Sequence, residues 1–179
     1  MTLHRSLAVT ILLALLVGAC RGPGSGIASP TPGSTLTPTI PGLAPNDSPP
    51  GTAISALPFS DSVNVTRAAI HASETASTCG SGTQSVWYSF LATAAGTVIA
   101  DTTGSDYDTI LDIFRGQLSA DIQDPGFERL EPVACNDNSG TSLQSGVVFE
   151  VVAGQNYVIR VGTALDATGG NLRFSLTGS

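Results

Sequence analysis

The stretch Gly146–Val152, which reads GVVFEVV, shows most clearly how this chain folds. Val147, Phe149 and Val151 occupy every second position, and Glu150 falls between them. Because successive side chains of a β-strand point to opposite faces of the sheet, this alternation predicts a strand with one buried and one solvated face. Half-buried strands of this kind are typical of antiparallel sheets.

Similar runs recur on both sides of this stretch, separated by clusters of Gly, Asp, Asn and Ser, which is the usual signature of strands joined by turns. Arg160 and Arg173 lie on the polar side of two of them, so we expect both to point away from the core. One or two further strands are expected from Ile54 to Phe59 and around Val63, and no segment shows a long helical stripe. The sequence therefore predicts an all-β domain, a single antiparallel two-sheet β-sandwich. The remaining runs are Ser85–Leu91, Gly96–Thr102, Thr109–Phe114, Leu130–Ala134, Tyr157–Val161 and Asn171–Leu176.

The composition limits the partners that such a domain binds. The chain has 179 residues, a net charge of −7 and no lysine, and only 12% of its residues are charged. Nucleic-acid binding needs clustered Arg or Lys, whereas the arginines here are scattered singly, so no nucleic acid is expected as a partner. The length leaves room for one domain of ordinary size, which we expect to be a monomer.

The N-terminus resembles a bacterial lipoprotein signal. His4 and Arg5 precede an apolar stretch that ends in Val17-Gly18-Ala19-Cys20, which is similar to a lipobox. The resemblance implies that residues 1–19 are a signal peptide and that Cys20 is acylated, which would anchor the protein in the bilayer of the cell membrane or outer membrane, facing outside the cytoplasm. The alternative is a membrane-spanning anchor, for which the apolar stretch is short.

Residues 20–53 are rich in Pro, Gly, Ser and Thr and have no apolar periodicity, so we expect them to be a flexible linker. The folded domain is then expected over residues 54–179. If Cys20 is acylated, Cys79 and Cys135 are the two remaining cysteines. Because the compartment outside the cytoplasm favours oxidation, we expect a disulfide between them. A metal site or a reactive thiol are the alternatives, but each would need neighbouring groups that are missing nearby in the sequence.

Several short motifs occur in an order that resembles the bacterial pre-peptidase C-terminal (PPC) domain. They are Leu57–Ser60, Ser85–Phe90, Ala95–Val98, Asp101–Thr109, Ala134–Asp137, Ala153–Tyr157 and Gly170–Leu176. The resemblance implies a jelly-roll-like β-sandwich that is noncatalytic. It also implies that the domain binds an extracellular polymer such as collagen, or holds calcium.

Catalytic groups are scarce in the sequence. A serine nucleophile needs a histidine base, and the only histidines are His4, within the signal, and His71, in an Ala-rich segment. We therefore expect that the protein is not an enzyme.

Two acidic turns could hold calcium, because Ca²⁺ takes six to eight oxygen ligands from carboxylates, amides and backbone carbonyls. The candidate ligands are Asp106, Asp108, Asn136, Asp137 and Asn138. Asp and Asn are also common turn formers, so the same residues can serve the backbone alone. Tyr107 and Trp87 are candidate ligand-binding residues, and core packing is the alternative for Trp87.

Together these features predict a membrane-anchored, noncatalytic cell-envelope lipoprotein whose sandwich binds an extracellular or envelope polymer, either a polysaccharide or a protein. A structural or assembly protein that docks a protein partner is the second interpretation, and a hydrolase is the third.

Overall fold

The computed structural model describes residues 43–165 and 167–178. The chain divides into two units, residues 1–37 and 38–179, and all described residues belong to the second. The predicted signal peptide, the lipidation site Cys20 and most of the predicted linker lie outside the described residues. In the part of the chain that the structure describes, no helix is long and apolar enough to cross a membrane.

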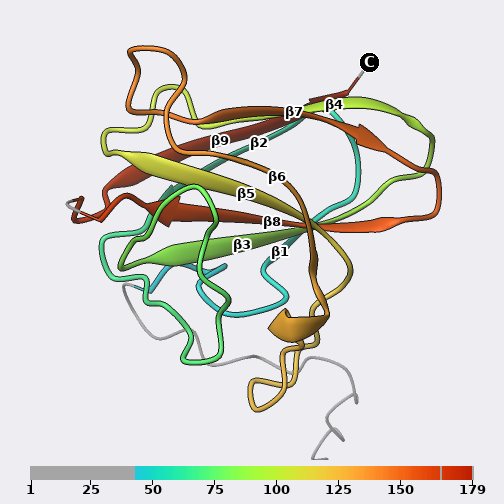
Figure 1. Ribbon diagram of the computed structural model, residues 1–179, viewed down its shortest axis with the longest axis horizontal. Coiled ribbons are helices and arrows are strands. Elements are labelled where there is room, and N and C mark those ends of the chain that lie inside the picture. The colour runs from blue at the N-terminus through green and yellow to red at the C-terminus, as the bar shows by residue number, and fades with distance from the viewer. Residues whose placement is uncertain (1–42, 166, 179) are drawn as a thin grey trace, which may run out of the picture. The chain divides into compact units, whose positions relative to one another are not determined.

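The described chain forms two β-sheets that face each other, as the sequence predicts (Figure 1). One sheet has five strands in the order β1-β3-β8-β5-β6, and the other has four in the order β2-β9-β4-β7. The only helical element among the described residues is a 3₁₀ turn, Phe127–Arg129. The strands are β1 Thr52–Ile54, β2 Phe59–Asn64, β3 Ser85–Leu91, β4 Gly96–Asp101, β5 Thr109–Arg115, β6 Glu131–Asn136, β7 Gly146–Val151, β8 Asn156–Thr163 and β9 Asn171–Gly178.

The core lies between the inner faces of the two sheets. Alternate residues of each strand point into it, as the period of two requires. Tyr88 of β3 stacks on Phe174 of β9 with ring centroids 4.4 Å apart, so the two sheets meet through aromatic rings. The hydroxyl of Tyr88 donates a hydrogen bond of 3.0 Å to Asp61 Oδ2 on β2, which satisfies its polar end.

Residues before position 54, the expected start of the domain, also pack against the sheets. Ala44 and Asn46 are buried, and the Asn46 carbonyl accepts a hydrogen bond of 2.9 Å from the Trp87 amide. Strand β1 then pairs with β3 in parallel, so the sheets are not wholly antiparallel. Gly51 has φ 77° and a Cβ there would overlap the Trp87 carbonyl, so only glycine permits this close approach.

The outer faces of the two sheets differ. On the five-stranded sheet the outer face is covered by residues 65–84, which we call the covering segment, and by residues 116–130. Trp87, Phe114, Leu118, Phe127 and Val158 are buried there in a second apolar cluster. On the four-stranded sheet the outer face is exposed, with Val148 of β7 at 65% and Ile99 of β4 at 45% exposure.

Candidate functional site

A buried charged cluster lies under the covering segment. Arg160 of β8 and Asp112 of β5 are register partners on neighbouring strands. Arg160 Nε and Nη2 donate to Asp112 Oδ2 at 3.1 and 2.9 Å, and both side chains are at most 7% exposed. Arg160 does point away from the core, as expected from the sequence, but the covering segment removes it from solvent.

The covering segment supplies the remaining partners of this ion pair. Ser77 Oγ donates to Asp112 Oδ1 at 2.6 Å, and the Thr75 carbonyl accepts from Arg160 Nη1 at 2.5 Å. The guanidinium also lies 5.7 Å from the Trp87 ring centroid and 5.8 Å from that of Phe114, within the range of cation–π attraction. The ion pair therefore lies on strands β5 and β8, and the covering segment shields it from solvent.

Glu74 brings a second carboxylate to the same cluster. Its side chain is 1% exposed, and Oε1 lies 3.5 Å from Arg160 Nη1. Oε2 accepts hydrogen bonds from the His71 amide at 2.7 Å and from Ser85 Oγ at 3.0 Å, whereas Oε1 is buried without a hydrogen-bond partner. Burial raises the pKa of Glu74, and the hydrogen bonds from Ser85 and His71 and the charge of Arg160 offset only part of this rise.

A cavity of about 160 Å³ adjoins this cluster. It is lined by Glu74, Ser85, Asp112 and Arg160 and by the apolar side chains of Ile70 and Ile110. Ile70 is 45% exposed and forms part of the rim. The cavity therefore combines apolar walls with buried charge, the usual composition of a small-ligand site.

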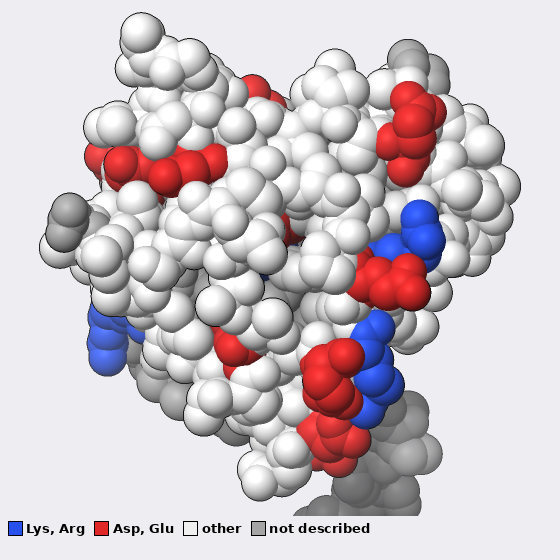
Figure 2. Space-filling model, viewed as in Figure 1, with Lys and Arg blue, Asp and Glu red and all other residues white. Residues whose placement is uncertain are grey.

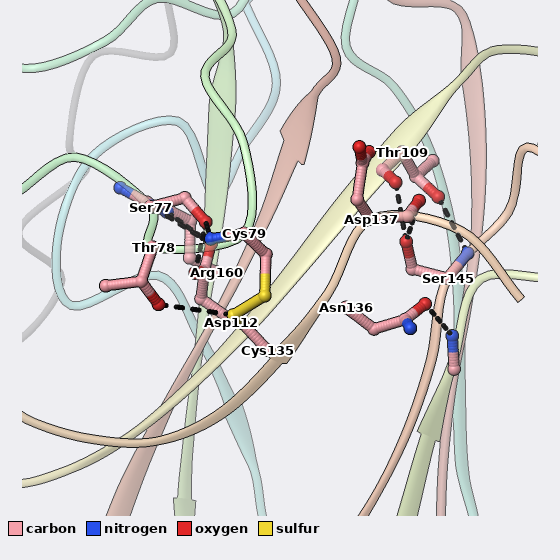
Figure 3. The surroundings of a disulfide bond; sticks show 11 residues. Ser77, Thr78, Cys79, Thr109, Asp112, Cys135, Asn136, Asp137, Ser145 and Arg160 are labelled. Carbon is pink, nitrogen blue, oxygen red and sulfur yellow. Dashed lines mark hydrogen bonds and ion pairs between the residues drawn. A yellow bond between two sulfur atoms is a disulfide. The ribbon is translucent and has the colours of Figure 1, made fainter.

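The predicted disulfide is confirmed, and it lies beside the charged cluster. Cys79 of the covering segment bonds to Cys135 of β6, with the two Cα atoms 5.9 Å apart (Figure 3). Cys135 is the register partner of Asp112 on the neighbouring strand. The bond therefore ties the covering segment to the sheet at the position where Ser77 reaches Asp112.

The candidate calcium ligands do not form the predicted carboxylate set. Asp106 accepts hydrogen bonds from the Asn171 amide at 2.6 Å and from Asn171 Nδ2 at 2.7 Å, so it fixes the start of β9. These bonds lower the pKa of Asp106. Within residues 43–165 and 167–178, no group of three or more His, Cys, Asp or Glu side chains is placed to hold a metal ion. The expected convergence of three carboxylates is therefore wrong.

Of the other candidate ligands, Asn136 binds backbone through its side chain, whereas Asp108 Oδ1 and Asp137 Oδ1 are buried without a hydrogen-bond partner. Asn136 Oδ1 accepts from the Gly146 amide at 3.3 Å, and the Asp137 carbonyl accepts from Ser145 Oγ at 2.7 Å (Figure 3). Asn138 is exposed. Asp108 and Asp137 do lie near each other: burial, and then the charge of Asp137, raise the pKa of Asp108.

Neither aromatic candidate faces solvent. Trp87 is 1% exposed and its ring lies 5.0 Å from that of Phe127, so the packing alternative holds. Tyr107 is 8% exposed, and burial raises the pKa of its hydroxyl. The prediction that these residues bind a ligand is corrected, because both rings fill the interior.

His71 participates in local structure. Its Nε2 faces the Ile122 carbonyl at 3.1 Å, its Nδ1 lies 2.9 Å from Ser73 Oγ, and its ring contacts Phe127 at 5.5 Å. A catalytic histidine is oriented by a carboxylate or an equivalent group and has a free ring nitrogen for the nucleophile. Here the Ser73 amide also donates to Nδ1, at 3.3 Å, so the Ser73–His71 contact belongs to a turn.

The sequence analysis missed the charged cluster because its members are far apart along the chain. Glu74 and Asp112 are separated from Arg160 by whole strands. The sequence signal that was present is the charge of Asp112 within Thr109–Phe114, an otherwise apolar strand. A carboxylate in such a strand needs a buried cationic partner.

Comparisons with known proteins add little to this description. No family model and no curated protein matches the chain. Aeromonas hydrophila PliG, a periplasmic lysozyme inhibitor of g-type lysozyme, is similar at 13% identity and a TM-score of 0.40, over 70% of this chain and 91% of that one. CorA, a surface-associated copper-binding protein of Methylomicrobium album BG8, is similar at 10% identity and a TM-score of 0.44, over 72% and 98%. Neither likeness is strong enough to assign a family or a function.

Proposed function

We propose that this chain is a noncatalytic, lipid-anchored protein of the cell envelope whose sandwich binds an extended extracellular protein. The observation that carries the proposal is the outer face of the four-stranded sheet, which we call the bare face. It presents short hydroxyl side chains around an apolar centre and few charges. Its residues are Ser60, Ser62, Asn64, Thr97, Ile99, Asp101, Val148, Glu150, Asn171, Arg173, Ser175 and Thr177.

The centre of the bare face is apolar. Ile99 pairs directly with Val148 across β4 and β7, and with Thr177 across β4 and β9. Exposed apolar side chains that lie next to each other form a patch that a partner can cover. On the side of the molecule seen in Figure 2, charged side chains likewise gather in a few separate groups on an otherwise uncharged surface.

A protein fits this surface better than a polysaccharide. Every Phe, Tyr and Trp of the sequence lies in the described ranges and is buried or half-buried. Stacking of a sugar on a protein surface needs an exposed ring, and the described chain offers none. The resemblance to PPC domains, which remains a prediction, points in the same direction.

An array of extracellular proteins and polysaccharides tests this proposal with the full chain. We expect saturable binding to one or more extended proteins, collagen among them, and none to polysaccharides. Binding to polysaccharides alone would contradict the proposal. Co-purification with one stoichiometric envelope protein, without binding to the arrayed proteins, would favour the assembly role instead.

A further inference from the structure

The cavity beside Glu74 adjoins a cluster with more acidic than basic side chains. The cluster holds one guanidinium, from Arg160, and two carboxylates, from Asp112 and Glu74. All three side chains are at most 7% exposed. A buried charge without a partner is costly, so an excess carboxylate in this position is suited to a cationic guest.

The cavity does not favour an anion or a metal ion. Three of the five N–H groups of Arg160 donate to oxygens of Asp112 and Thr75, and Nη1 also lies 3.5 Å from Glu74 Oε1, so the guanidinium is already surrounded by protein oxygens. Both oxygens of Asp112 accept hydrogen bonds as well, from Ser77 and from Arg160. Glu74 Oε1 is the carboxylate oxygen of the cluster that accepts none, and a single such oxygen is far from the ligand set of Ca²⁺ or Mg²⁺.

We propose that this cavity binds a primary ammonium group at the end of a short alkyl chain, as in a lysine side chain of a partner protein. The Glu74 carboxylate would accept from the ammonium, and Ile70 and Ile110 would line the alkyl chain. The volume of about 160 Å³ would hold roughly five waters at their liquid volume, or an alkyl chain of similar size.

Two further properties of the chain agree with this guest. The sequence contains no lysine, so the ammonium group has to come from another molecule, and the net charge of −7 attracts cations. The cavity lies on the five-stranded sheet, whereas the bare face belongs to the four-stranded sheet. The inference therefore stands apart from the proposed function and can fail independently of it.

Titration of the full chain with n-butylammonium chloride tests the inference, with n-butanol in matched sodium chloride as the uncharged control. We expect saturable shifts of the Glu74 and Ser85 amide signals in NMR spectra near pH 7.5, and at least tenfold weaker binding of n-butanol. Equal binding of the two compounds, or no saturable shift, would overturn the inference. This comparison needs no variant.

Two matched variants locate the binding group. Glu74→Gln should weaken n-butylammonium binding at least tenfold, because it keeps the size of the side chain and removes its charge. Glu128→Gln removes the same charge from an exposed position outside the cavity and should leave the affinity within twofold. An unchanged affinity in Glu74→Gln would overturn the inference.

A second pair of probes distinguishes the sources of the ammonium group. Nα-acetyl-lysine methylamide should bind like n-butylammonium, since its ammonium ends a four-carbon chain. Glucosamine carries its ammonium directly on a sugar ring and should not bind. Binding of glucosamine without the lysine derivative would overturn the assignment to lysine.

Discussion

Arg160 is the residue on which the charged cluster depends. It lies between two carboxylates and over two aromatic rings, with a side chain that is 7% exposed. Removing one partner of a buried ion pair leaves the other charge without compensation, whereas replacing the whole pair by apolar groups is far milder. Loss of Arg160 alone should therefore cost more stability than loss of the whole pair.

Arg160→Met should lower the free energy of unfolding by about 3–5 kcal/mol, because Asp112 and Glu74 lose their counter-ion. The double variant Arg160→Met with Asp112→Leu should lose less than the single one. Urea denaturation of both variants checks this. As a control, Arg115→Met removes an exposed ion pair with Glu131 and should cost only about 0–1 kcal/mol. A double variant less stable than Arg160→Met would contradict the account.

Glu74 should make stability depend on pH with a definite sign. Burial raises its pKa in the folded state above the ordinary value of 4.5, so the folded state holds the proton more tightly than the unfolded state. The contribution of Glu74 to the stability of the fold therefore falls as the pH rises from its ordinary pKa of 4.5 through its raised pKa in the folded state. The stability of Glu74→Gln relative to the parent should accordingly increase as the pH rises above 4.5. Urea denaturation across this range measures the difference, and a decrease would refute the assignment.

At the scale of elements, most strands could be predicted from the sequence. The position of the covering segment over the five-stranded sheet could not. The alternation in Gly146–Val152 and Asn171–Leu176 marks the buried faces of β7 and β9, because the period of two follows directly from strand geometry. The covering segment has no such period, so nothing local shows that it lies over Arg160. Strand β1 was missed because its three residues follow a Pro-rich stretch and pair in parallel with a distant strand.

The positions of the candidate calcium ligands could not be predicted for a related reason. Asp106 and Asp108 stand two positions apart, and the sequence shows that they share a turn but not which neighbour each one meets. The Asp106 carboxylate accepts a hydrogen bond from the amide of Asn171, which is 65 residues away in the sequence. The disulfide could be predicted because Cys79 and Cys135 are the two cysteines left after Cys20, in a protein expected outside the cytoplasm. That prediction needed no knowledge of the three-dimensional structure.

The disulfide should hold the covering segment against the sheet. Reduction, or the double variant Cys79→Ser with Cys135→Ser, should lower stability by roughly 4 kcal/mol for a closed loop of this length, with a separation of 56 residues. Amide exchange in residues 70–84 should rise more than in β4 and β7. Differential scanning calorimetry and hydrogen exchange check both effects. An unchanged melting temperature under reducing conditions would contradict this role.

We propose that the whole molecule consists of a lipid anchor followed by a sandwich, in which the outer face of one sheet is covered and that of the other is bare. Cys20→Ser should move the protein from the membrane fraction to the soluble fraction of cells, because the residue that would carry the acyl chains is lost. Fractionation and mass spectrometry of the N-terminus measure this. The melting temperature of the sandwich should not change. Retention of Cys20→Ser in the membrane would contradict lipid anchoring and favour a spanning anchor.

The affinity of the bare face for its protein ligand tests the central claim most directly. Val148→Asp places a charge at the apolar centre of this face, and Leu165→Asp places the same charge at an equally exposed position outside it. With the protein identified on the array, surface plasmon resonance should show at least tenfold weaker binding for Val148→Asp and unchanged binding for Leu165→Asp. Equal affinities of Val148→Asp and the parent chain would show that the bare face is not the binding surface.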